Sequence, residues 1–233
     1  MQKKIRKESA VKTHCWFDMD HTLIRNDCDV SWKYFLVRKG LADAGETERT
    51  ADRFYQQYLA RTLIPEDFME FQLREFRGRT PGEVALLARE HFETVVRPLI
   101  YPDALALVRR LAAQGVPLAI VTSTNEAVAR PVAEFFGISE LFGATPEIAD
   151  GRYTGRMTGI YPVREGKVKI LENYCCKHAL KPEQFAYYGD SMSDAEILSR
   201  VGEPHAVNPG EELARLAAEN NWAVESFRLT DGR

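Results

Sequence analysis

Two aspartates, Asp18 and Asp20, are the first residues of the chain whose type and spacing could do chemistry. They follow the apolar run of residues 15–17 directly, within the heptapeptide FDMDHTL. On a strand, residues i and i+2 point the same way, so the two carboxylates would repel each other unless a cation lay between them. The motif therefore indicates either a polar turn or a site that holds a cation.

Polar side chains also follow three later apolar runs of the chain. Thr122 and Ser123 come after PLAIV, Asp190 and Asp194 lie in the segment GDSMSD after FAYY, and NPG follows HAV. Doubly wound sheets place their ligands at the carboxyl ends of the strands, so these side chains are expected to gather at one edge. Converging carboxylates suit Mg²⁺, a hard cation that takes oxygen ligands and leaves other positions to water and phosphate. The first pair of aspartates can therefore coexist if Mg²⁺ and a substrate phosphate occupy the space between the strand ends.

Short β-rich runs separated by helical patterns must position these residues, and they predict an α/β fold. The expected core is a doubly wound, mostly parallel, Rossmann-like sheet built from residues 1–25 and 99–233. Residues 26–98 have apolar residues at three- and four-residue intervals and helix starts at Pro65 and Pro81, which predicts a helical cap inserted after the first strand. Residues 150–168 are rich in turn formers and indicate a hairpin.

The composition argues against several classes of protein. The chain has 233 residues and a formal net charge of −3, which gives no electrostatic case for a nucleic-acid partner. No apolar run approaches the roughly 20 residues that span a membrane, and the basic segment 1–14 lacks the apolar stretch of a signal peptide. Four cysteines at irregular spacing favour reduced thiols in the cytoplasm. The oligomeric state is left open.

The ordered set of motifs resembles that of the haloacid dehalogenase superfamily. Its members share D-x-D-x-T after a strand, a Thr or Ser ending the next strand, a lysine, and G-D-x-x-x-D after a later strand. The helical insertion directly after the first motif resembles the phosphoserine-phosphatase-like branch, whose small bacterial hydrolases are assigned to phosphoserine-like substrates or to histidinol phosphate. The resemblance implies a Mg²⁺-dependent phosphatase that acts on a small phosphorylated metabolite.

The resemblance also implies a role for each matching carboxylate. Asp18 would be the nucleophile that forms an aspartyl-phosphate intermediate. Asp20 would protonate the leaving alcohol and then deprotonate the hydrolytic water, for which its pKa must be raised. The side chains of Asp18 and Asp190 and the backbone carbonyl of Asp20 would hold Mg²⁺, and Asp194 would support the metal site.

The phosphate itself would be bound by a hydroxyl, by backbone amides and by a lysine. Thr122 would donate to a phosphate oxygen, together with backbone N–H groups at Ser123 and the helix start beyond it. The family's lysine lies some two dozen residues before the G-D motif, and 190 − 167 = 23 favours Lys167, although Lys169 also lies nearby. Each motif alone has an ordinary explanation, such as a capped turn or a surface lysine, so the prediction depends on the ordered set.

Substrate selection would fall to the inserted helices. Asp27 stands nine residues after Asp18, where phosphoserine phosphatases have a glutamate that binds the substrate's ammonium. The shorter acid departs from that pattern and weakens the case for phosphoserine itself, while still favouring an amine or imidazole. Aromatic residues of the insertion are either walls for such a cation or the insertion's own core, and two arginines could meet a carboxylate: Trp32, Phe54, Tyr55, Tyr58 and Phe71, with Arg53 and Arg61.

Two other activities fit the same motifs. A phosphotransferase or phosphomutase of the same family would use an alcohol in place of water. A phosphoryl-accepting signalling module would hold the phosphoryl group on Asp18. Asp20 argues against this module because it provides a means of hydrolysis, and the helical insertion has no role in it.

Overall fold

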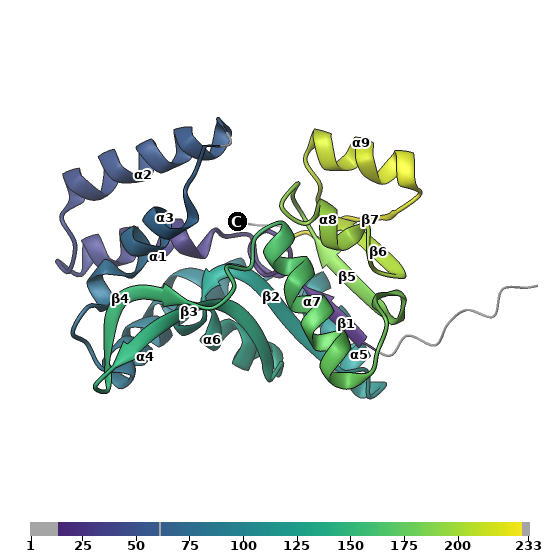
Figure 1. Cartoon of the computed structure of the whole chain (residues 1–233), viewed down its shortest axis with the longest axis horizontal. Helices are drawn as coiled ribbons and strands as arrows, with labels where there is room; N and C mark the ends of the chain where they lie inside the picture. The colour runs from purple at the N-terminus through teal and green to yellow at the C-terminus, as the bar shows by residue number, and fades with distance from the viewer. Residues whose placement is uncertain (1–13, 61, 230–233) are drawn as a thin grey trace, which may run out of the picture.

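The strands form one seven-stranded sheet in the order β4-β3-β2-β1-β5-β6-β7 (Figure 1). The computed structural model describes residues 14–60 and 62–229, so most of the basic segment 1–14 lies outside the described residues. Every neighbouring pair is parallel except β3 and β4, which confirms the predicted mostly parallel α/β fold. The strands are β1 (His14–Phe17), β2 (Leu118–Asn125), β3 (Glu140–Ala149), β4 (Arg152–Thr158), β5 (Phe185–Gly189), β6 (Glu203–Val207) and β7 (Ala223–Glu225).

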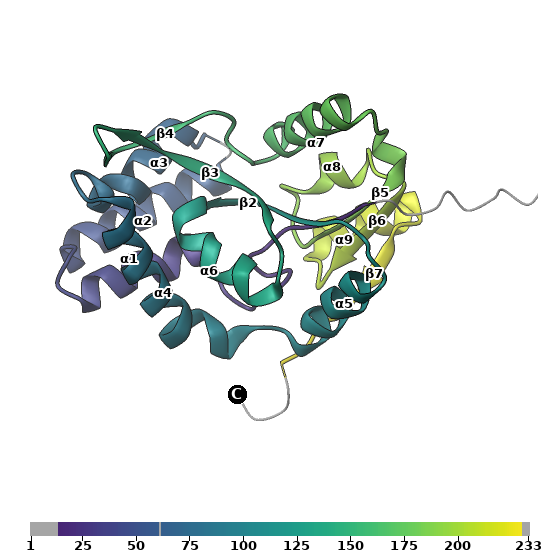
Figure 2. The ribbon, with the colours of Figure 1, turned by 90° about the horizontal axis from the view of Figure 1, so that it is seen from below.

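Helices cover both faces of this sheet, and Figure 2 shows α5 and α7 on opposite sides of the strands. Successive residues of β1 explain why, because side chains along a strand alternate between the two faces. Phe17 belongs to a buried cluster with residues of α5 (Pro102–Ala113) and α6 (Glu126–Phe136). Trp16 belongs to a second cluster with α7 (Glu165–His178), α8 (Ala195–Leu198) and α9 (Glu211–Asn220). The sheet is therefore doubly wound.

The register of the central strands brings their carboxyl ends to one edge. Phe17, the last residue of β1, lies opposite Ile120 of β2 and Tyr188 of β5. The backbone N–H of Asp18 donates to the carbonyl of Tyr188 at 2.8 Å, which continues the pairing one residue past the strand. Asp18, Thr122 and Asp190 consequently lie within about one residue of the same level.

Between β1 and α5, the described residues form four helices and three short helical segments. Figure 1 shows α1, α2 and α3 above β3 and β4, and α4 below them next to α6. Helices α3 and α4 begin at Pro65 and Pro81, as predicted, and Thr80 and Glu83 form a capping box at the start of α4. The elements are α1 (Cys28–Arg38), α2 (Ala44–Leu59), α3 (Pro65–Leu73), η1 (Arg74–Phe76), α4 (Pro81–His91), η2 (Phe92–Val96) and η3 (Arg97–Leu99).

The predicted hairpin at residues 150–168 is wrong in position. The hairpin consists of β3 and β4, residues 140–158, and its turn at Asp150 and Gly151 has positive φ at both residues, as a two-residue turn requires. β3 also pairs with β2, so the hairpin extends the main sheet. Tyr153 exchanges backbone hydrogen bonds with Gly78 and Arg79, at 2.8 and 2.9 Å. The hairpin thus connects the sheet to the inserted helices, which sequence periodicity did not indicate.

A buried histidine lies among the inserted helices. His91 of α4 has its Nε2 3.0 Å from the hydroxyl of Ser31, and its ring contacts those of Trp32 and Phe35. Its Nδ1 has no hydrogen-bond partner among the described residues. Burial, and to a lesser extent the charge of Arg38, lowers the pKa of His91 from 6.5 to about 4.

Lowering the pH from 7 to 5 is therefore expected to destabilise the protein through His91. Over this range the unfolded chain binds this proton more readily than the folded protein, so the free energy of unfolding falls as the pH falls, by about 2 kcal/mol for this one group. Urea unfolding at pH 7 and pH 5 measures this fall in the free energy of unfolding. The fall should be smaller by this amount in His91→Gln than in the wild type. The control His178→Gln, at an exposed position, should keep the wild-type effect. An unchanged pH effect in His91→Gln would contradict the prediction.

Candidate functional site

Three carboxylates meet at the carboxyl ends of β1 and β5. Oxygen atoms of Asp18, Asp190 and Asp194 all lie within 4.8 Å of one another. Asp18 and Asp194 are buried. A Cβ on Gly189 would lie 2.6 Å from the carboxyl carbon of Asp194, so only glycine lets that side chain pack against the end of β5. The sequence motifs at both strand ends are thereby brought into one site.

A buried lysine bridges two of these carboxylates. Nζ of Lys167, the third residue of α7, lies 2.6 Å from Oδ1 of Asp18 and 2.6 Å from Oδ1 of Asp194. The Lys167 side chain is only 2% exposed, whereas that of Lys169 is 62% exposed and lies 4.0 Å from Glu165. Of the two candidate lysines, Lys167 is therefore the one that contacts the carboxylates.

Tyr187 of β5 also belongs to this group, and sequence reasoning missed it. Its hydroxyl donates to Oδ1 of Asp194 at 2.8 Å and accepts a hydrogen bond from Nζ of Lys167 at 3.2 Å. The side chain is fully buried. The only signal in the sequence was a tyrosine within an otherwise apolar run, and that signal does not distinguish Tyr187 from Tyr188.

Asp20 turns away from Lys167 and toward β2 and α1. Its Oδ2 accepts a hydrogen bond from the hydroxyl of Thr124 at 2.7 Å and lies 3.5 Å from that of Thr122. Its Oδ1 accepts from the backbone N–H of Cys28 at 2.9 Å. Burial, followed by the charge of Asp27, raises the pKa of Asp20 to about 6 against these hydrogen bonds. A carboxyl group with this pKa can both give and take a proton near neutral pH.

Strand β2 is longer than predicted, which changes the neighbours of Asp20. It continues three residues past Thr122, to Asn125. Thr122 and Thr124 lie on the same side of the strand and both reach Asp20, whereas Ser123, between them, points to the other side. No hydrogen bond among the described residues connects the Ser123 side chain to the carboxylates. The two-residue spacing of the threonines in the segment TST was the sequence signal that could have identified Thr124 as a second neighbour of Asp20.

Burial, together with mutual repulsion, raises the pKa values of Asp18 and Asp190. Burial raises the pKa of Asp18 to about 7, with Asp194 and Asp20 adding to the effect and Lys167 opposing it. Burial and the charges of Asp18 and Asp194 raise the pKa of Asp190 to about 9. For Lys167, burial alone would lower the pKa, but the carboxylates of Asp18 and Asp194 raise it. One lysine thus faces three carboxylates, and a donor set made entirely of carboxylate oxygens fits a hard divalent cation.

The residues predicted to select the substrate divide into several environments. Asp27 is exposed and caps α1, where its Oδ1 accepts from the backbone N–H of Val30 at 2.9 Å. Trp32, Phe54 and Phe71 are buried in the packing of the inserted helices, which favours the core explanation. The side chain of Tyr58 and the whole of Arg61 lie outside the described residues, and two candidates are exposed: Arg53 and Tyr55.

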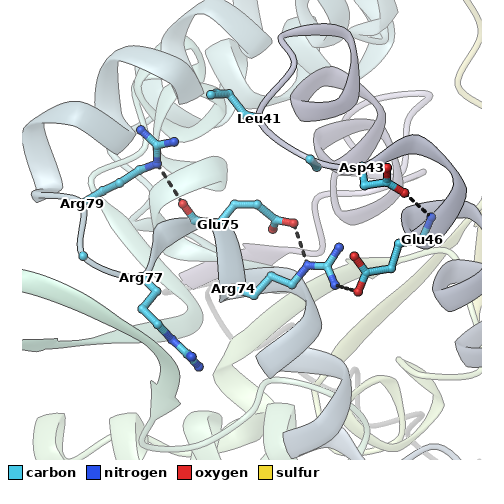
Figure 3. A pocket seen from close by; sticks show the side chains of 9 residues that line it. Leu41, Asp43, Glu46, Arg74, Glu75, Arg77 and Arg79 are labelled. Atoms are coloured by element: carbon cyan, nitrogen blue, oxygen red, sulfur yellow. Dashed lines mark hydrogen bonds and ion pairs between the residues drawn. The ribbon is translucent and has the colours of Figure 1, made fainter.

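An open hollow of about 650 Å³ lies elsewhere, on the inserted helices (Figure 3). None of the site residues predicted from the sequence lines it. Arg74 pairs with Glu46 and Glu75, and Nε of Arg79 donates to the carbonyl of Glu75. The charged side chains drawn in the hollow already have partners. The hollow is therefore not a second candidate site comparable to the carboxylate group at the strand ends.

Two further findings concern membrane spans and cysteines. No helix in residues 14–60 and 62–229 combines the length and the hydropathy that a membrane span needs. All four cysteines lie within these ranges, and they form no disulfide.

Known proteins resemble this chain in family model, in sequence and in fold. The family model described as haloacid dehalogenase-like hydrolase matches residues 15–199. A protein named histidinol-phosphatase, from Neisseria meningitidis serogroup C (strain 8013), is 35% identical over 216 residues, covering 91% of this chain and 97% of the relative. A crystal structure of a protein with unknown function from Bordetella pertussis Tohama I is 36% identical, with a TM-score of 0.85 and coverage of 92% and 98%. A substrate-bound phosphoserine phosphatase has a TM-score of 0.66 at 16% identity, covering 92% of each chain, and supports the fold alone.

Proposed function

The chain belongs to the haloacid dehalogenase-like hydrolase family, and from this membership we propose that it is a Mg²⁺-dependent phosphatase of small phosphomonoesters. The observation that carries the proposal is the position of Lys167, 2.6 Å from both Asp18 and Asp194. Asp190 completes the carboxylate group beside them. A nucleophile, a fixed positive charge and oxygen ligands for a metal are thereby combined at one edge of the sheet.

In the proposed reaction, an oxygen of Asp18 attacks phosphorus, so that a new P–O bond forms while the ester P–O bond breaks. Asp20 donates its proton to the leaving alkoxide, and the product alcohol departs. Water then attacks the aspartyl-phosphate, Asp20 takes a proton from it, and the P–O bond to Asp18 breaks to release inorganic phosphate. The hydrogen bonds from Thr124 and from the N–H of Cys28 support this role, because they hold the Asp20 carboxyl group in one orientation.

The phosphoryl group carries negative charge throughout, so positive charge and hydrogen-bond donors must surround it. We propose that Lys167 supplies a fixed charge and Thr122 a hydroxyl donor, with the backbone N–H of Ser123 nearby. Asp18, Asp190 and the backbone carbonyl of Asp20 would hold Mg²⁺, supported by Asp194. When bound, the ion supplies positive charge at the phosphoryl oxygens.

The substrate in this proposal is an amine-bearing ester of the cytoplasm, such as phosphoserine or histidinol phosphate. The relative named histidinol-phosphatase supports this class of substrate. The acidic residues at the start of α1, Asp27 and Asp29, support it as well, because they favour a cationic group beside Asp20.

Phosphate release from a panel of esters tests the proposal, with Mg²⁺ and then with EDTA. The panel comprises phosphoserine, histidinol phosphate, phosphoethanolamine, sugar phosphates and an aryl phosphate. We expect metal-dependent turnover with an amine-bearing ester well ahead of the others. Transfer of the phosphoryl group to an added alcohol in place of water would indicate a phosphotransferase. No turnover, together with stable labelling of Asp18 by a small phosphodonor, would indicate a phosphoryl-accepting module.

Removal of the Tyr187 hydroxyl should weaken catalysis without unfolding the protein. Tyr187→Phe deprives Lys167 and Asp194 of a buried hydrogen-bond partner, which is worth about 1–2 kcal/mol, so kcat is expected to fall about tenfold. The matched control is Tyr188→Phe, since the Tyr188 ring packs on the other face of the sheet, against Phe17. Equal kcat values for the two variants in steady-state phosphate release would contradict a positioning role for Tyr187.

A further inference from the structure

A chain of hydrogen bonds runs from the loop after Asp20 into the inserted helices. Asn26, in this loop, uses its side-chain amide twice: Nδ2 donates to the hydroxyl of Ser31 at 2.8 Å and to Sγ of Cys28 at 3.4 Å. Its backbone carbonyl accepts the N–H of His21, the residue after Asp20, at 3.3 Å. Asn26 thus joins the turn that follows Asp20 to the start of α1.

The far end of this chain is anchored at a buried histidine. The hydroxyl of Ser31 lies 3.0 Å from Nε2 of His91, the last residue of α4. His91 is fully buried, and its ring contacts those of Trp32 and Phe35. Because Ser31 accepts a hydrogen bond from Asn26, its own hydrogen can be given to His91. Residues of two inserted helices therefore fix the orientation of the Asn26 amide.

The near end of the chain reaches the Asp20 carboxyl group through Cys28. Cys28 is fully buried, and its backbone N–H donates to Oδ1 of Asp20 at 2.9 Å. Its thiol also forms a hydrogen bond with Asp20. Because Cys28 is the first residue of α1, its N–H has no partner within the helix, and the bond to Asp20 depends on where the helix begins. Asn26 fixes that point, since its amide holds the Cys28 sulfur.

Two contacts on opposite oxygens fix how the Asp20 carboxyl group lies. From the core, the hydroxyl of Thr124 on β2 donates to Oδ2 at 2.7 Å, and from α1 the N–H of Cys28 donates to Oδ1. With Thr124 alone the group could still rotate about its bond to Cβ, so the contact from Cys28 determines the direction of the acidic proton. This direction matters, because a displacement of about 1 Å can slow an enzymatic step about a hundredfold.

We propose that Asn26 is a positioning residue for the acid–base step, because it holds Cys28 on Asp20 and thereby directs the carboxyl group at the leaving oxygen. This inference rests on the proposed phosphatase function, in which Asp20 protonates that oxygen. Ser31 and His91 take part by fixing the Asn26 amide. The inserted helices thereby contribute to proton transfer at Asp20.

The first test compares two esters that differ in their need for a proton. 4-Nitrophenyl phosphate releases a stable nitrophenolate anion, whereas 4-nitrobenzyl phosphate, one methylene group longer, releases an alkoxide that must be protonated. The value of kcat/KM covers the steps up to departure of this group. Asn26→Ala should lower kcat/KM at least about tenfold for the nitrobenzyl ester and less than about threefold for the nitrophenyl ester. Equal changes on the two esters, or no change on either, would overturn the inference.

Ser31→Ala forms the second test, because it removes the anchor of the Asn26 amide and keeps the amide itself. We expect the same selective loss on the nitrobenzyl ester, but a smaller one, of about threefold. In the double variant with Asn26→Ala the two losses should not multiply, because both act through Cys28. Losses that multiply would overturn the connection between Ser31 and Asn26. The matched control is Asn220→Ala, at an exposed position of α9, which should leave both values unchanged.

Hydrogen exchange of the Cys28 amide, measured by NMR, separates this inference from the proposed function. Its N–H donates to Asp20, so its protection reports that contact without any turnover. In Asn26→Ala the Cys28 amide should exchange at least about tenfold faster than in the wild type, while the amide of Tyr187 in β5 exchanges as before. If neither ester is hydrolysed, the phosphatase proposal fails, while the exchange rate still decides whether Asn26 holds Cys28 on Asp20. Unchanged exchange at Cys28 would overturn the inference even if both esters are hydrolysed.

Discussion

Asp18→Asn is expected to lower kcat at least about 10³-fold, because a carboxamide cannot replace the carboxylate that attacks phosphorus. The substitution is nearly isosteric and removes one of three mutually repelling carboxylates. Lys167 keeps its contact with Asp194. The variant should therefore fold, with a melting temperature close to that of the wild type.

Single-turnover phosphate release and thermal unfolding together test this expectation. Asp18→Asn should also fail to form the acid-stable, base-labile phosphoryl adduct expected of an aspartyl-phosphate. A suitable control is Asp52→Asn, which makes the same chemical change at an exposed position of α2. An Asp18→Asn protein with wild-type kcat would refute the proposed mechanism, whatever the substrate.

Lys167→Met is expected to impair both catalysis and stability. The substitution leaves Asp18 and Asp194 buried without their shared cation, and breaking a buried ion pair in this way costs about 3–5 kcal/mol. Turnover should fall at least about 10³-fold, since the phosphoryl group loses its fixed positive charge.

Mg²⁺ is expected to restore part of the lost stability but little of the activity. An ion that binds the carboxylates of the folded protein stabilises that state by mass action. Urea unfolding with Mg²⁺ and with EDTA should therefore show a larger effect of Mg²⁺ on Lys167→Met than on the wild type. Lys169→Met, at an exposed position on the same helix, should match the wild type in both assays. Wild-type stability of Lys167→Met in EDTA would contradict the buried ion pair.

The two predictions concern a site whose residues come from distant parts of the chain. Asp18 follows β1, Lys167 belongs to α7, and Asp194 precedes α8. A different local feature positions each residue. Continued strand pairing positions Asp18, and the start of α7 positions Lys167. Close packing on Gly189 positions Asp194. A Cβ on Gly166 would lie 1.8 Å from the carbonyl oxygen of Tyr161, so the start of α7 also depends on a glycine.

The sequence by itself determined the α/β class, the mostly parallel sheet and the ordered motifs. The reason is local: short β-rich runs with polar residues at their ends alternate with helical periodicity, and both patterns are visible within a few residues. The starts of α3 and α4 were predictable for the same reason, because Pro65 and Pro81 favour the first turn of a helix. The order of the motifs likewise sufficed to select Asp18, Asp20 and Asp190 as candidates.

Only the tertiary structure decided which side chains touch. It distinguishes Lys167 from Lys169 and Thr124 from Ser123, since burial and partners depend on the elements packed against each residue. It also reveals Tyr187, whose hydroxyl has a role only because α7 carries a lysine to it across the sheet face. Contacts between residues 20 or more positions apart follow from strand order and helix packing, and neither is encoded in a local pattern.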